Sequence, residues 1–193
     1  NRDEEALTLL GNATDPQSVT TRLLILIDRG ESEKGAETIR DLSIDEKWCD
    51  HAAFVLAQTG KDKDAQAMLA WAGENGDALL ERRCRVAIAR ATLMRLAVAH
   101  GDSAFSILSI SADAAKAVEQ VLACLSPIVD ECHARRRVET GLEADAVGFA
   151  YNCCRLIGQL EAARSNAELL RDRRPGHLDY ANAVIRGDAE FDA

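Results

Sequence analysis

One stretch, residues 78–100, most constrains what this sequence can fold into. It contains neither glycine nor proline, so nothing in it interrupts a helix. Asp77 can cap its start, and Gly101 can end it in a left-handed conformation. From Val86 onward the stretch is almost entirely apolar, which is typical of a helix surrounded on most sides by other elements. We therefore expect one long central helix over these residues.

Arginines interrupt this apolar stretch. The simplest interpretation of Arg90 and Arg95 is that their stems pack against the core while their charged ends reach water. The alternative is that one of them lines a groove and binds the carboxylate of a partner. In either case, these charges make the stretch unsuitable as a membrane-spanning helix.

The composition favours an all-α fold and limits the partners. The chain has 193 residues, of which 47% are hydrophobic and only three are proline, and it shows little strand-like alternation. Its net charge is −9, so neither free nucleic acid nor an anionic membrane is an expected partner. The chain does not begin with methionine, so we expect a processed form or a fragment of a larger protein.

No signal peptide or membrane anchor is visible in the sequence. Six cysteines in a chain of this length do not suggest a disulfide framework, so we expect buried thiols and a cytoplasmic, reducing location.

A helix start is encoded at Asp15-Pro16, because aspartate caps a helix and proline fits its first turn. This helix is predicted to run to Arg29 and to end at Gly30. The apolar run 23–27 inside it could instead form a buried strand, but the cap and the terminal glycine favour a helix.

Two segments have the form of a capping box. In this motif a side-chain hydroxyl accepts a hydrogen bond from the backbone N–H of a glutamate three residues later, and the glutamate side chain accepts one from the backbone N–H of the first residue. Ser43 with Glu46 predicts a helix that continues through Trp48. Thr140 with Glu143 predicts a second helix start.

Other segments leave alternatives open. Pro127 either kinks one long helix that starts after Ser111 or separates two helices. For residues 102–110 we predict a short helix or an extended crossover, and for residues 178–185 a last helix. The whole chain is then all-α, with about nine to ten helices.

One pattern recurs along the chain: an apolar helix, a glycine, a few polar residues and an alanine-rich helix. It occurs around Gly30, Gly60 and Gly158. Such units cannot bury both faces alone, so they stack on one another. The prediction is a right-handed stack of αα-hairpins, an α-solenoid, in a single domain over 1–193. The repeat units lie near 16–42, 44–73 and 143–176, with the long helix 78–100 between them.

The third unit resembles a tetratricopeptide repeat. Gly158 lies at the turn, Ala163 matches the small residue that lets the two helices pack closely, and Pro175 matches the closing proline. The usual first-helix tryptophan and tyrosine are replaced here by Val147 and Cys154. Gly60 with Ala65 matches the same pattern in part, and Gly30 with Ala36 matches it less well.

The resemblance implies a concave face lined by the first helix of each pair. That face would present Asn152 and Arg155 in one repeat, and Lys47, Asp50 and Phe54 in the other. Asparagine and arginine suit the backbone or the carboxylate of a bound peptide, as would Arg90 of the central helix. We therefore expect a protein-interaction module or scaffold that binds a protein or peptide partner. A plain solvated helix face is the alternative interpretation of these residues.

Catalytic and metal-binding patterns do not emerge. The clusters with metal-ligand types, 49–51, 132–133 and 153–154, lack the spacing of a structural zinc site. No glutamate lies three residues before a histidine, and no glycine-rich phosphate loop occurs. We predict no catalytic residue, no metal site and no cofactor.

Two other functions remain open at this stage. One is an all-α enzyme or small-ligand sensor with a pocket beside the central helix, near Arg90, Arg95 and His100. The other is a structural domain that forms a homodimer through the helix face from Val118 to Cys132.

Overall fold

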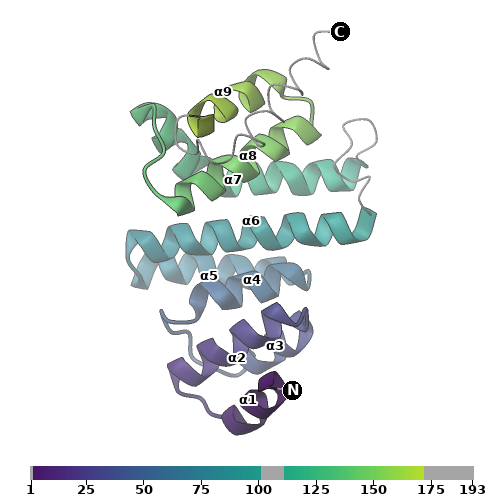
Figure 1. Ribbon diagram of the computed structural model, residues 1–193, viewed down its shortest axis with the longest axis vertical. Coiled ribbons are helices and arrows are strands. Elements are labelled where there is room, and N and C mark those ends of the chain that lie inside the picture. The colour runs from purple at the N-terminus through teal and green to yellow at the C-terminus, as the bar shows by residue number, and fades with distance from the viewer. Residues whose placement is uncertain (1, 101–110, 172–193) are drawn as a thin grey trace. The chain divides into compact units, whose positions relative to one another are not determined.

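The computed structural model describes residues 2–100 and 111–171, apart from the side chains of residues 100 and 171. Within these residues the chain forms nine helices and no strand, which confirms the all-α prediction (Figure 1). The helices are α1 Arg2–Leu10, α2 Pro16–Asp28, α3 Ser32–Ile39, α4 Cys49–Gln58, α5 Asp62–Asn75, α6 Ala78–His100, α7 Ala112–Arg135, α8 Gly141–Leu156 and α9 Leu160–Arg171.

The long helix predicted over 78–100 is confirmed as α6, and Asp77 caps it by accepting a hydrogen bond of 2.7 Å from the backbone N–H of Leu80. The apolar run 23–27 is helical, within α2, and Asp15 caps that helix. Helix α7 is continuous through Pro127, so the proline does not separate two helices. The segments 102–110 and 178–185 lie outside the described residues, as do Gly101 and Pro175.

The predicted capping box at Ser43 and Glu46 is wrong. Helix α4 begins at Cys49, and Trp48 precedes it without a side-chain cap. Trp48 is only 1% exposed, and the backbone N–H of Cys49 donates to the carbonyl of Asp45 over 3.0 Å. Burial of the large indole sets the start of this helix, because it outweighs the small gain from a cap.

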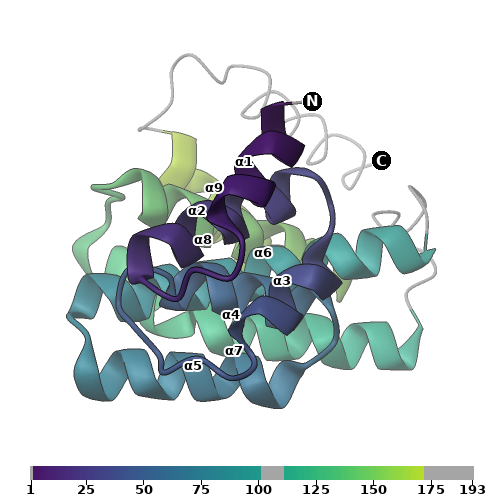
Figure 2. The same cartoon turned by 90° about the horizontal axis from the view of Figure 1, so that it is seen from below.

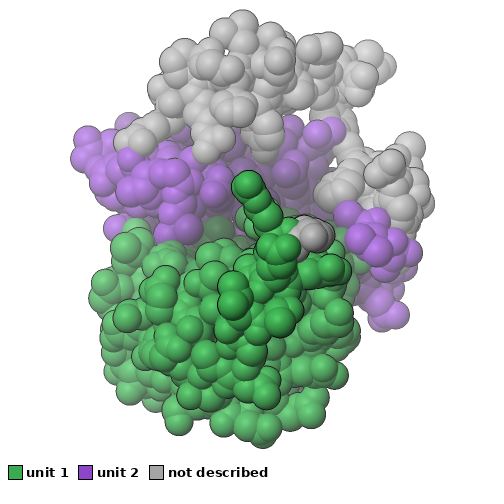
Figure 3. All heavy atoms as spheres, turned by 60° about the horizontal axis from the view of Figure 1, so that its bottom comes forward, with its two compact units in different colours: residues 1–95 green, residues 96–193 purple. Residues whose placement is uncertain are grey.

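Contacts within the chain divide it into two compact units, residues 1–95 and 96–193, and the boundary falls inside α6 (Figure 3). In unit 1, α2 packs on α3, α3 on α4, and α4 on α5 (Figures 1 and 2). In unit 2, α7 packs on α8 and α8 on α9. The single domain expected from the sequence stays a prediction.

Three of the connections between helices have the same backbone geometry. Gly30, Gly60 and Gly158 adopt φ values of +70°, +76° and +76°, and each lies two residues after one helix and two before the next. In each, the N–H after the glycine donates to a carbonyl five residues back: Glu31 to Leu26 at 2.8 Å, Lys61 to Leu56 at 2.9 Å, and Gln159 to Cys154 at 2.8 Å. This is the Schellman end of a helix, which favours glycine because side chains strain the left-handed conformation.

The residues around these turns are buried at equivalent positions. Eleven, seven and four residues before the glycine, the first helix buries Val19, Leu23 and Leu26 in α2, Cys49, Ala53 and Leu56 in α4, and Val147, Tyr151 and Cys154 in α8. Five residues after the glycine, the second helix buries a small residue, which is Ala65 in α5 and Ala163 in α9.

In α3 the residue at this spacing is Gly35 rather than Ala36. Gly35 is buried, and a Cβ atom there would lie 3.1 Å from Cγ1 of Val55. A small residue at this point lets the second helix approach its neighbours closely.

Replacing Gly158 by alanine is expected to destabilise the protein by about 1–2 kcal/mol, because alanine is strained at a φ of +76°. A Cβ atom at Gly158 would meet nothing within 4 Å, so the loss measures backbone strain alone. The free energy of unfolding in urea tests this. Gly141→Ala is the control: its Cβ atom also meets nothing, and no such strain applies. Equal losses in both variants would contradict the account of the turn.

The connection from α7 to α8 is held by the second capping box, which the structure confirms. Thr140 Oγ1 accepts from the N–H of Glu143, and Glu143 Oε2 accepts from the N–H groups of Glu139 and Thr140 over 2.7 and 3.2 Å. Arg135 adds a charged hydrogen bond of 2.8 Å from Nη2 to Glu143 Oε1. Burial raises the pKa of the Glu143 carboxyl, but Arg135 and the two backbone N–H groups outweigh burial and hold this pKa below its usual value.

Glu143→Gln is expected to lower the free energy of unfolding by about 1–2 kcal/mol at pH 7, because it removes the charge that Arg135 and two N–H groups bind. Since the folded pKa lies below the unfolded one, the stabilisation is complete above about pH 5 and is lost as the pH falls through the folded pKa. The difference between variant and wild type should therefore shrink on acidification. Urea unfolding at pH 7 and pH 3 measures it, with the exposed Glu168→Gln as control. A pH-independent difference would contradict this account.

Candidate functional site

Three of the residues predicted to bind a partner lie together in unit 1. Asp50 and Phe54 are one turn apart on α4, and the guanidinium carbon of Arg90, on α6, lies 5.8 Å from the centroid of the Phe54 ring. The ring is only 7% exposed, whereas Arg90 is exposed. This is a cation–π contact in which the ring holds the arginine stem and leaves the charge at the surface.

Asp50 forms an ion pair with Arg83, and no motif in the sequence connects these two residues. Nε and Nη2 of Arg83 lie 2.8 and 2.6 Å from Oδ2 of Asp50, and Nδ1 of His51 lies 2.9 Å from Oδ1. Burial raises the pKa of Asp50, but His51 and Arg83 outweigh it and keep this pKa below its usual value. The ion pair therefore leaves little charge on Asp50 for a ligand.

We define the α4–α6 face as Asp50 and Phe54 of α4 with Leu79, Arg83, Arg90 and Met94 of α6. The four α6 residues follow one another at spacings of four, seven and four residues, which places them on one side of the helix. Leu79 and Met94 are 55% and 40% exposed. Within the described residues no carboxylate pairs with Arg90, so the face combines exposed apolar groups with one uncompensated positive charge.

The other predicted residues lie elsewhere. Lys47 is exposed in the turn before α4, where its carbonyl accepts a 3.1 Å hydrogen bond from the hydroxyl of Thr20. Asn152 and Arg155 are half-buried on α8 in unit 2. The guanidinium carbon of Arg155 lies 5.7 Å from the centroid of the Tyr151 ring, a second cation–π contact.

Arg95 has a structural role. Its Nη1 donates to the carbonyl of Ala57 over 2.8 Å, and its two terminal nitrogens lie 3.1 and 3.2 Å from the carboxylate of Asp62. This arginine therefore ties α6 to the end of α4 and the start of α5. It contacts protein groups rather than a ligand, and the side chain of His100 lies outside the described residues.

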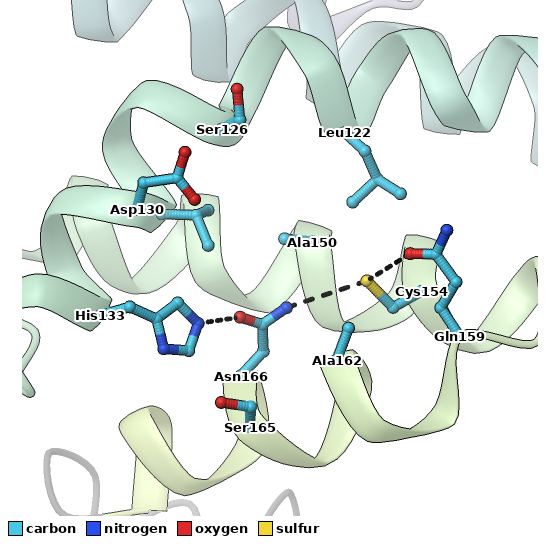
Figure 4. A pocket seen from close by; sticks show the side chains of 11 residues that line it. Leu122, Ser126, Asp130, His133, Ala150, Cys154, Gln159, Ala162, Ser165 and Asn166 are labelled. Carbon is cyan, nitrogen blue, oxygen red and sulfur yellow. Dashed lines mark hydrogen bonds between the residues drawn. The ribbon is translucent and has the colours of Figure 1, made fainter.

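Unit 2 contains a pocket of about 360 Å³ between α7, α8 and α9 (Figure 4). Figure 4 shows Ser126, Asp130 and His133 following one another along α7, with Asn166 of α9 opposite them. The pocket is lined by Leu122, Ser126, Val129, Asp130, His133, Ala150, Cys154, Gln159, Ala162, Ser165 and Asn166.

A chain of polar contacts crosses the floor of this pocket. Nε2 of His133 lies 2.7 Å from Oδ1 of Asn166, which is 4% exposed. The amide nitrogen of Asn166 lies 3.9 Å from Sγ of Cys154, and that sulfur lies 3.9 Å from Oε1 of Gln159. No signal in the sequence marks this site, because His133 and Asn166 are 33 residues apart and form no motif.

The cysteines are all buried free thiols. Burial raises the pKa of Cys153 to about 12 and also raises those of Cys132 and Cys154. Sγ of Cys49 lies 3.8 Å from Sγ of Cys84, which joins α4 to α6 inside the core.

The described residues lack two features, a cluster of metal ligands and a membrane-spanning helix. Residues 2–100 and 111–171 contain no group of three or more His, Cys, Asp or Glu side chains placed to hold a metal ion. None of their helices combines the length and apolarity needed to cross a bilayer.

Comparison with known proteins does not assign the chain to a family. No protein-family model matches it, and neither a curated protein nor a solved structure is significantly similar to it.

The folded protein is expected to react slowly with a thiol reagent such as DTNB at pH 8, because all six cysteines are buried and thiolates are the reactive species. Absorbance should report six thiols in urea and essentially none within minutes under native conditions. Rapid modification of any cysteine in the folded protein would contradict the burial described here.

Proposed function

We propose that the chain is a protein-interaction module, built as a right-handed stack of tetratricopeptide-like αα-hairpins, that binds a partner polypeptide at the α4–α6 face. The observation that carries the proposal is the contact of Arg90 with the ring of Phe54, since the sequence predicted both residues to bind a partner.

The shared geometry of the glycine turns supports the hairpin stack. Each helix before these turns ends in the same way. Gly30, Gly60 and Gly158 adopt a left-handed conformation, and the N–H of the next residue donates to the carbonyl five residues before it. Equivalent positions of the first helices are buried in all three. A repeated unit requires the same turn geometry and burial at equivalent positions, since each hairpin must cover the face of its neighbour.

The chemistry of the face supports an acidic, partly apolar partner segment. Arg90 supplies a positive charge that a carboxylate can pair with, and arginine is enriched among residues that dominate binding energy. Leu79 and Met94 offer exposed aliphatic surface on either side of it along α6. Phe54 keeps the guanidinium in place before the partner arrives, which lowers the entropic cost of binding.

We favour this face over a homodimer through the α7 face from Val118 to Cys132. Val118, Leu125 and Cys132 are fully buried and so are not available to a second copy. Six free thiols are compatible with the proposed cytoplasmic, reducing location.

Selection of peptides from a random display library on the immobilised full chain tests the proposal. We expect the selected peptides to combine acidic with aliphatic residues, because Arg90 and its apolar neighbours define the face. Arg90→Glu should weaken their binding about tenfold or more, since it replaces an attraction by a repulsion. Fluorescence polarisation of labelled peptides measures the affinities.

Lys63→Glu is the matched control, because it makes the same charge change at an exposed site on α5. Its binding should stay within about twofold of wild type. Selected peptides that lose equal affinity in both variants, or in neither, would contradict binding at the α4–α6 face.

A further inference from the structure

The lining of the unit 2 pocket carries negative charge without a permanent positive charge. Among the residues that line it, Asp130 is the only one with a permanent charge, and no lysine or arginine is present. Asp130 is exposed at the rim, and within the described residues it forms no ion pair with a cation. An anionic ligand would meet this carboxylate without a lysine or arginine of the described lining to balance it, whereas a cation would neutralise it.

The polar groups around Asp130 are ready to accept hydrogen bonds. The hydroxyl of Ser126, one turn before Asp130, donates to the carbonyl of Ala123 over 3.1 Å, so its lone pairs remain available. Oδ1 of Asn166 accepts from His133 and has a second lone pair. A ligand that carries several N–H donors fits such a set of acceptors.

The remaining lining is apolar and suits an aliphatic stem. Leu122, Val129, Ala150 and Ala162 come from all three helices that surround the pocket. Arginine and lysine side chains combine an aliphatic stem with a cationic end. Their methylene stems pack on apolar surface, while their charged ends stay near water and near groups of opposite charge. The volume of about 360 Å³ lies within the range of pockets that take a small ligand group.

We propose that the unit 2 pocket binds the side chain of an arginine or lysine presented by a partner polypeptide, with its stem between α7 and α9 and its cationic end at Asp130 and Ser126. Asn166, which is 96% buried, is a fixed acceptor at the floor, held by His133. This inference goes beyond the α4–α6 face: it concerns other residues and a partner group of opposite charge.

Titration of the ¹⁵N-labelled full chain with short capped peptides tests the proposal by NMR. The probes are acetyl-Ala-Ala-Xaa-Ala-Ala-amide with Xaa as arginine, lysine, norleucine or glutamate. We expect the arginine and lysine peptides to shift the side-chain amide signals of Asn166 and the backbone signals of Ser126 and Asp130. They should bind about fivefold more tightly than the norleucine peptide, a typical effect for one partly exposed ion pair, and less tightly as salt rises.

Two variants of the lining and one control variant locate the binding. Asp130→Asn should reduce the affinity for the arginine peptide about fivefold and leave the norleucine peptide unchanged, whereas Glu168→Gln removes an equal charge outside the lining and should change neither. Ala162→Phe, at an exposed position of the lining, should abolish binding by filling the pocket.

The proposal is overturned if the norleucine peptide binds as tightly as the basic ones, or if Asp130→Asn has no effect. Shifts confined to residues outside the pocket, or no shift with any peptide at millimolar concentration, would overturn it too. None of these results bears on Arg90, so a failure here is distinguishable from a failure of the proposed α4–α6 face.

Discussion

The left-handed glycine between paired helices is the constraint on which the described fold depends. Gly30, Gly60 and Gly158 each lie two residues after one helix and two residues before the next. The N–H of the following residue donates a hydrogen bond to the carbonyl five residues before it. That short turn fixes where the second helix begins relative to the first. The small residue five positions later can then lie in the core, and the apolar face of the first helix is covered.

Three arginines attach α6 to α4 in three different ways. Arg83 forms an ion pair with Asp50, Arg90 lies over Phe54, and Arg95 donates to the carbonyl of Ala57. Arg83 and Arg95 have protein carboxylates as partners, so their charges are balanced within unit 1. Only the Phe54 contact leaves a charge at the surface, because an aromatic ring holds a cation without neutralising it. The packing of α6 on α4 thus also produces the feature that we propose for partner binding.

Local signals in the sequence predicted most of the helix boundaries. Asp15, Asp77 and Thr140 each cap the helix they were expected to cap, since a capping side chain acts on N–H groups within three residues. Ser43 failed because the start of α4 is set by the burial of Trp48, which depends on contacts from elsewhere in the fold.

The candidate sites were only partly predictable for the same reason. The resemblance to a tetratricopeptide repeat implied that Asp50 and Phe54 share one face, but no local pattern connects Asp50 with Arg83, 33 residues later. The pocket of unit 2 likewise depends on His133 meeting Asn166 across two helices. Contacts over such separations follow from tertiary packing, which a single sequence does not encode in any short motif.

Site-specific photocrosslinking in cells that make the protein tests the central claim most directly. A benzophenone amino acid at Met94, exposed beside Arg90 on α6, should capture a discrete partner protein, and the crosslink should disappear when Arg90 is replaced by glutamate. The same group at Lys63, exposed on α5, should capture no such partner. A crosslinked partner that persists without Arg90, or that forms equally from position 63, would contradict the assignment of the α4–α6 face as the binding surface.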